Sequence, residues 1–126
     1  METRRFPRVA VHLKLSVTLD EKAEQSIALN SGKYFEATGT DISEGGLGLV
    51  VKKYYLPKGT KIELIIDGSP LELKKEMKLS AEVKYCRNYE AYKYKCGVKF
   101  TEISEEYIVA IRKFIAKYNN RQKTLS

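Results

Sequence analysis

Hydrophobic and polar residues alternate along the segment that follows residue 8. The odd-numbered positions carry Val, Val, Leu, Leu, Val and Leu between residues 9 and 19, whereas the even-numbered positions carry Ala, His, Lys, Ser and Thr. A period of two places one face of a strand in a core and the other in water. The pattern predicts a strand over residues 9–19, with His12 exposed on its polar face.

Shorter strand-like segments follow, rich in apolar and β-branched residues. They are residues 34–41, 47–51 and 61–66. Turn-forming residues follow each of them, at 43–46, 52–59 and 67–68. Residues 71–75 are expected to pair briefly before the next strand. The polar segment 20–32 has no strand period and is expected to form a long hairpin loop, or a short helical turn around residues 21–25.

Alternation returns in the last third of the chain. Residues 77–87 and 92–100 each alternate, and residues 88–91 suit a chain reversal, so the two segments predict a hairpin. Cys86 and Cys96 fall on its two arms. Their proximity depends on the strand register, which the pattern leaves open.

The period changes after Ile103. Apolar side chains now recur every three or four residues, at Ile103, Tyr107, Ile108, Ile111, Phe114, Ile115 and Tyr118. This stripe predicts an amphipathic helix, with Ser104 as its N-cap and Glu105 and Glu106 at its positive end. About six short antiparallel strands followed by one helix imply a small barrel or sandwich, with the helix over an edge or an open end.

Composition narrows the classes of function. The chain has 126 residues, which fits a single domain. It has no apolar run long enough to span a membrane and no signal peptide, so a cytoplasmic protein is expected. One histidine and two cysteines without zinc-site spacing predict no metal site, and the thiols are expected to be reduced. The 23 Lys and Arg residues against 16 Asp and Glu favour an anionic partner.

Arginine is concentrated in the arm that precedes the first strand. Arg4, Arg5 and Arg8 lie close together there, and Pro7 disfavours helix at the preceding residue. A guanidinium binds phosphate, or the O6 and N7 edge of guanine, through two parallel hydrogen bonds and also stacks on a base. The arm taken alone is equally compatible with a basic disordered terminus.

A second segment with candidate chemistry begins at residue 41 and reads Asp-Ile-Ser-Glu-Gly-Gly-Leu-Gly. Asp41 and Ser43 can each hold nearby backbone N–H groups in a turn. Gly46 can adopt a positive φ and let a backbone or a ligand approach closely. Taken alone, the segment is equally compatible with a bulged turn between two strands.

Together the two segments resemble the PilZ domain, a bacterial receptor for the second messenger cyclic di-GMP. Arg4 and Arg8 match the family's RxxxR motif before the first strand, and Asp41, Ser43 and Gly46 match its [D/N]xSxxG turn. The segment 96–100, Cys-Gly-Val-Lys-Phe, is similar to the closing strand of the family. The resemblance implies a six-stranded antiparallel β-barrel with a C-terminal helix over residues 9–126, preceded by a flexible arm at residues 1–8.

The resemblance also implies a ligand and a set of contacts. Arg4 and Arg8 would bind the phosphates and guanines of cyclic di-GMP, and Arg5 would be a third cation. Asp41 would accept from a guanine or hold an arginine in place, Ser43 would contact guanine or phosphate, and Gly46 would leave room. Catalysis is not expected, because no base–nucleophile set or metal cluster accompanies these residues.

Two other functions fit parts of the sequence. Nine tyrosines and a charge of +7 would suit a barrel that binds single-stranded nucleic acid. Tyr92 and Tyr94, however, share the face of Val98 and Phe100, which predicts core positions, so no polynucleotide is expected. A barrel of this type could also serve protein interaction alone. In the favoured interpretation, ligand binding orders the arm and an unidentified protein of motility, pilus or polysaccharide machinery recognises the result.

Overall fold

The structure is a computed structural model that describes residues 6–19 and 34–125, with side chains described as far as residue 119. The loop or helical turn predicted at residues 20–32 lies outside the described residues. So do Arg4 and Arg5 of the arginine-rich arm.

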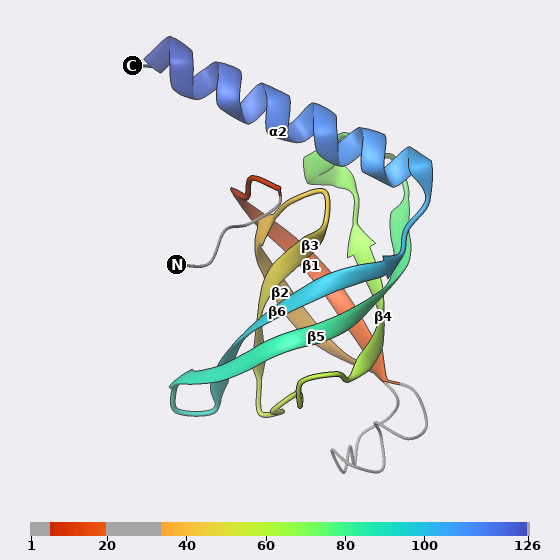
Figure 1. The fold of residues 1–126 in the computed structure, drawn as a ribbon, viewed down its shortest axis with the longest axis vertical. Coiled ribbons are helices and arrows are strands. Elements are labelled where there is room, and N and C mark those ends of the chain that lie inside the picture. The colour runs from red at the N-terminus through yellow and green to blue at the C-terminus, as the bar shows by residue number, and fades with distance from the viewer. Residues whose placement is uncertain (1–5, 20–33, 126) are drawn as a thin grey trace.

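Six antiparallel strands close into a barrel (Figure 1). They are β1 (Val9–Leu19), β2 (Tyr34–Ile42), β3 (Gly46–Lys52), β4 (Lys61–Asp67), β5 (Glu76–Glu90) and β6 (Lys93–Glu102). The order around the barrel is β1-β2-β3-β6-β5-β4, and β4 pairs with β1 to complete the ring. The six-stranded barrel is therefore confirmed, and a sandwich is excluded because every strand is paired on both sides.

The interior of the barrel is filled by alternate residues of the strands. In β1, Leu13 and Val17 are fully buried while His12, just before Leu13, is exposed, as the alternation predicted. The other strands contribute the same kind of residue, among them Ile42, Leu47, Leu49, Leu64, Ile66, Met77 and Val83. Since the interior takes the apolar side chains, the polar and glycine residues between them form the outer surface.

The helix α2 (Glu105–Leu125) lies across one end of the barrel (Figure 1). It buries Ala110, Ile111 and Ile115 against that end. The N–H of Tyr107 donates to Ser104 Oγ at 3.4 Å, which supports the predicted N-cap. The helix covers an open end because the closed barrel leaves no unpaired edge for it.

Two local predictions were wrong. Residues 71–75 do not pair as a strand; a short 3-10 helix, η1 (Ser69–Leu71), ends at the first of them. The carboxylate of Asp67 accepts hydrogen bonds from the N–H and hydroxyl of Ser69, at 3.0 and 2.7 Å. Pro70 lacks an N–H donor and suits the first turn of a helix, and Leu71 is buried. These local features favour the helical turn over strand pairing.

The second error concerns Tyr92. Strand β5 continues to Glu90, so the reversal is shorter than predicted and Tyr92 lies in the tight turn, with φ +60°. Its side chain is 78% exposed, so it does not face the core. Tyr94, in contrast, lies on β6 and packs against the core as expected. The tight turn requires a left-handed residue, which overrides the alternation at that position.

Candidate functional site

The two sequence motifs meet where β1 begins and β2 ends. Ala10 of β1 is paired with Asp41 of β2, so the residues just before β1 lie beside the Asp41 side chain. Arg8 Nη1 lies 3.1 Å from Asp41 Oδ1, with 20% and 32% of the two side chains exposed. The carboxylate of Asp41 is thus the ion-pair partner of an arginine. A guanidinium has five N–H donors, so this ion pair uses only some of the donors of Arg8.

Ser43 organises the turn between β2 and β3. Its side chain is buried, and its Oγ accepts hydrogen bonds from the N–H groups of Gly45 and Gly46 at 3.2 and 3.1 Å. Its own N–H donates to the carbonyl of Gly46 at 2.9 Å. The hydroxyl therefore serves the backbone of the turn, which is the local role that the sequence predicted for it.

Of the two reasons expected for a glycine at position 46, only one applies. It does not have a positive φ; among the described glycines only Gly59 does, with φ +91°. Gly46 belongs to β3 and pairs with Lys99 of β6, and a Cβ at this position would overlap the carbonyl oxygen of Val98. The close approach of two backbones, the second part of the prediction, explains the glycine.

The neighbouring Gly45 accommodates the end of the arm. A Cβ at Gly45 would lie 2.8 Å from Cδ2 of Phe6, so the Phe6 ring lies directly on the turn. The N–H of Phe100 donates to the Gly45 carbonyl at 2.9 Å and joins the turn to β6. Residues 6–8 are thus attached to the turn at two points, the Phe6 ring and the Arg8–Asp41 ion pair.

The barrel wall next to Asp41 contains two glycines in one row, Gly48 and Gly97, here called the glycine strip. Asp41 pairs with Gly48 of β3, Gly48 with Gly97 of β6, and Gly97 with Tyr85 of β5. A Cβ at Gly48 would overlap the Asp41 carboxylate, and a Cβ at Gly97 would overlap the Tyr85 ring. The Asp41 carboxylate therefore covers Gly48, the Tyr85 ring covers Gly97, and both glycines are buried. The guanidinium carbon of Arg87 lies 5.0 Å from the centre of that ring.

Sequence reasoning did not single out Gly48, Gly97 or Tyr85 as site residues. Gly48 belongs to the glycine-rich segment that begins at Asp41, and Gly97 belongs to the segment 96–100. The spacing along the chain does not show that the two are neighbours, because only the registers of β3 and β6 place them side by side.

Ion pairs connect the turn and the barrel end to α2. Glu44, inside the turn, forms an ion pair and hydrogen bond with Arg112 of α2. This hydrogen bond raises the pKa of Arg112 above its ordinary value. Two further ion pairs attach the helix, Lys75–Glu106 at 3.0 Å and Lys117–Glu72 at 2.6 Å. The motif turn is therefore in direct contact with the helix.

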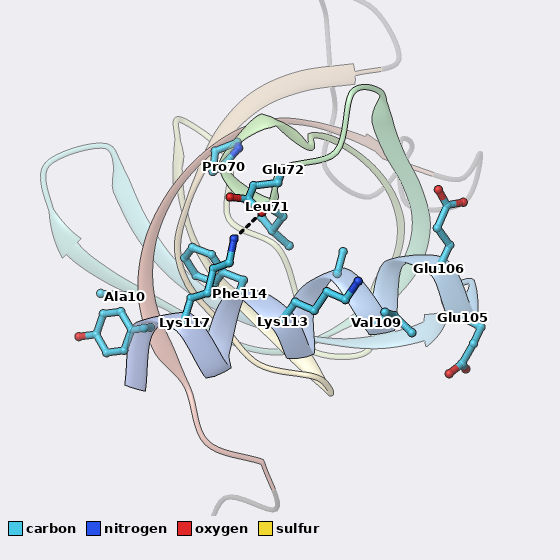
Figure 2. A pocket seen from close by; sticks show the side chains of 12 residues that line it. Ala10, Pro70, Leu71, Glu72, Glu105, Glu106, Val109, Lys113, Phe114 and Lys117 are labelled. Atoms are coloured by element: carbon cyan, nitrogen blue, oxygen red, sulfur yellow. Dashed lines mark hydrogen bonds and ion pairs between the residues drawn. The ribbon is translucent and has the colours of Figure 1, made fainter. Parts of the chain in front are cut away.

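A groove of about 660 Å³ lies between α2 and η1 (Figure 2). Leu71 and Phe114 contribute apolar surface to it, and Lys117 reaches across it to Glu72. The wall nearest the motifs is Ala10, the residue paired with Asp41. The groove therefore borders the site at the start of β1, but Arg8 and the glycine strip do not line it.

Within residues 6–19 and 34–125, no three His, Cys, Asp or Glu side chains are grouped closely enough to hold a metal ion. In the same part of the chain, no helix has both the length and the apolar character needed to cross a bilayer. The candidate site therefore consists of cationic, carboxylate, aromatic and backbone groups, which suit binding of a charged aromatic ligand.

Comparison with solved structures finds the same fold in several bacterial proteins. The inhibitor of motility MotI from Bacillus subtilis superposes with a TM-score of 0.72 at 18% identity, over 95% of this chain and 53% of its own. MrkH from K. pneumonia, in a complex with c-di-GMP, gives 0.71 at 16% identity, over 100% and 57%. This chain therefore spans about half the length of these two proteins.

A third structure matches this chain end to end. The PilZ domain of YcgR from Escherichia coli, solved with c-di-GMP, gives a TM-score of 0.67 at 13% identity and covers 98% of both chains. No curated protein sequence matches the chain. The family model of the PilZ domain, however, matches residues 2–117, which include both motifs, the whole barrel and most of α2. The chain belongs to the PilZ domain family.

Proposed function

We propose that this protein is a cyclic di-GMP receptor that binds the dinucleotide across the Arg8–Asp41 pair and the glycine strip. The observation that carries the proposal is the Arg8–Asp41 ion pair, which joins the two PilZ motifs at one point of the surface. It is supported by family membership and by the c-di-GMP complexes of YcgR and MrkH.

The chemistry of the ligand matches these groups. Cyclic di-GMP carries two phosphodiester anions and two guanines. Arg8, oriented by Asp41, offers N–H donors for a phosphate or a guanine Hoogsteen edge. Arg4 and Arg5 supply the further cations in this proposal. Ser43 and Gly46 act as positioning residues, because they shape the turn on which Arg8 and Asp41 meet.

Tyr85 is proposed as a stacking surface for one guanine. Its ring covers Gly97, and the two glycines add no side chain of their own between the ring and the Asp41 carboxylate. Base–aromatic stacking contributes roughly 1–3 kcal/mol per base. The guanidinium of Arg87 lies over the ring and adds a cation there, and a guanine stacked on that face would displace it.

Replacing Tyr85 with alanine should weaken cyclic di-GMP binding by about 5- to 100-fold, because the stacking surface is lost. Tyr85→Phe is the matched control and should bind within threefold of wild type, since stacking does not need the hydroxyl. Isothermal titration of both variants gives the comparison. Equal affinity of Tyr85→Ala and wild type for cyclic di-GMP would show that Tyr85 is not part of the binding site.

The proposed function is tested by titrating the full chain with cyclic di-GMP in a calorimeter, at two salt concentrations. Saturable binding with a modest salt dependence is expected, because two charges are neutralised. Absence of binding would contradict the proposal and favour a barrel used for protein interaction alone. Binding of a single-stranded oligonucleotide with a steep salt dependence would favour the nucleic-acid function instead. Recovery of the dinucleotide intact would support a receptor rather than an enzyme.

Signalling to a partner is proposed to start at the arm and the turn. Phe6 already lies against the turn, Arg8 contacts Asp41 near the end of β2, and Glu44 of the turn contacts Arg112 of α2. A ligand bound across the arm and the turn would create a new composite surface there. In this proposal the ligand orders the arm against the turn. Ordering of a segment on ligand binding is a common basis for recognition by a second protein.

Hydrogen exchange should detect this ordering. On addition of cyclic di-GMP, amides of residues 4–8 and 43–47 should gain protection, because the ligand holds both segments. Residues 9 and 10 already pair with β2, so a smaller change is expected there, and α2 should change less. A deletion of residues 1–8 should leave a folded barrel that does not bind. Unchanged exchange on saturation, or normal binding by the deletion, would contradict the mechanism.

A further inference from the structure

Two cysteine side chains meet on the hairpin formed by β5 and β6. Cys86 and Cys96 are directly opposite each other in the strand register, which the sequence left open. Both are free thiols, and their sulfur atoms lie 2.9 Å apart. Cys96 faces the core and is 1% exposed, whereas Cys86 is partly exposed.

We propose that Cys86 and Cys96 are a redox modification site that forms a reversible intramolecular disulfide. A disulfide needs an S–S distance of about 2.05 Å and Cα atoms roughly 4.4–6.8 Å apart. Directly opposite residues of antiparallel strands have Cα atoms about 4.5–5.5 Å apart, which meets the second condition. The sulfurs have to approach by about 0.9 Å, which side-chain rotation can supply without separating the strands.

The surroundings of the two sulfurs differ and give them different roles. Cys86 Sγ accepts a hydrogen bond from the N–H of Leu56 at 3.4 Å and another from the thiol of Cys96. Burial, reinforced by the hydrogen bond to Cys86, raises the pKa of the Cys96 thiol well above its ordinary value. The more accessible Cys86, with two donors for a thiolate, is therefore the attacking residue, and Cys96 is the resolving residue.

The oxidant in this proposal is a peroxide. The Cys86 thiolate attacks one peroxide oxygen, the O–O bond breaks, and hydroxide leaves and takes up a proton to become water. The sulfur of Cys96 then attacks the resulting sulfenic acid, the S–O bond breaks, and the Cys96 proton leaves with the hydroxide as a second water. Two thiols and one peroxide thus give one disulfide and two waters. Two equivalents of a small thiol restore the reduced pair by exchange.

The disulfide would link β5 to β6 covalently at Cys86 and Cys96. Cys86 follows Tyr85 directly and Cys96 precedes Gly97, so the disulfide would lock the register beside the Tyr85–Gly97 contact. It would also tie the base of the hairpin whose outer part is residues 87–95. Amides in that outer part are expected to exchange more slowly in the oxidised protein. Formation of this disulfide does not require cyclic di-GMP.

The test treats the reduced protein, residues 1–126, with stoichiometric hydrogen peroxide and follows it by intact mass and peptide mapping. Oxidation should remove two hydrogens, link the peptides that contain Cys86 and Cys96, and be reversed by dithiothreitol. Cys96→Ser should accumulate a sulfenic acid at Cys86 that dimedone traps. Cys86→Ser should leave the buried Cys96 much less reactive toward peroxide and alkylating reagents.

Several results would overturn the proposal. They are disulfide-linked dimers, oxidation to sulfinic acid without a cross-link, or no reaction at a peroxide concentration that oxidises free cysteine. Faster trapping at Cys96 in Cys86→Ser than at Cys86 in Cys96→Ser would reverse the assigned roles. If a serine variant does not fold, the mass and peptide map of the wild-type protein still decide whether the disulfide forms.

Discussion

Replacing Arg8 with alanine should weaken cyclic di-GMP binding on the order of 100-fold. A hydrogen bond to a charged group contributes roughly 1.5–3 kcal/mol, and Arg8 is proposed to make two with the ligand. Since about 1.4 kcal/mol corresponds to a tenfold change in affinity, the loss of two such hydrogen bonds lowers the affinity roughly 100-fold or more. The variant also leaves the Asp41 carboxylate without its ion-pair partner, close to the ligand phosphates.

The thermal stability of Arg8→Ala without ligand should hardly change. Its ion pair with Asp41 is partly exposed, and such pairs contribute roughly 0–1 kcal/mol. Arg8→Lys keeps the charge but loses the planar fork, so an intermediate affinity is expected. Lys58→Ala, which removes an exposed cation from the loop after β3, is the matched control and should bind normally. Arg4→Ala should behave like Arg8→Ala, and affinities within threefold of wild type for both would contradict the assigned site.

Replacing Gly46 with valine should destabilise the barrel by roughly 3 kcal/mol, the upper part of the range for overpacking. The added Cβ would overlap the carbonyl oxygen of Val98, which is backbone and cannot rotate away. Strands β3 and β6 would have to separate at that point, which also disturbs the Ser43 turn. Urea unfolding should show a lower midpoint, and cyclic di-GMP binding should weaken because the turn positions Asp41.

Lys52→Val is a matched control for this variant. It places the same side chain at the exposed end of the same strand, where it should leave the unfolding midpoint nearly unchanged. A Gly46→Val protein that is as stable as wild type and binds normally would show that β6 does not approach β3 as closely as described. It would also show that the turn is not part of the site.

The strands and the helix could be predicted because their patterns are local. Alternation over residues 9–19 predicted β1 with the bounds that the structure shows, and the change of period near residue 103 predicted the helix. Local patterns failed where specific backbone geometry prevailed. Examples are Tyr92, which the tight turn forces into a left-handed conformation, and residues 71–75, where η1 replaces strand pairing.

The candidate site was only partly predictable. The motif pattern identified Arg8, Asp41, Ser43 and Gly46, and the structure brings Arg8 and Asp41 into contact. The pattern did not show that the Ser43 hydroxyl is used by the turn, or that the carbonyl of Val98 is what excludes a side chain at Gly46. Those facts depend on how the turn folds and on how closely β6 approaches it.

By itself, then, the sequence determined the type of each main element and the residues that carry the cationic and carboxylate chemistry. The tertiary structure alone decided the registers across β2, β3, β6 and β5. Those registers bring Asp41, the two glycines and Tyr85 into one row and place Cys86 against Cys96. The physical reason is that side-chain periodicity is set by neighbours in the chain, whereas register depends on barrel closure and bulges between distant strands.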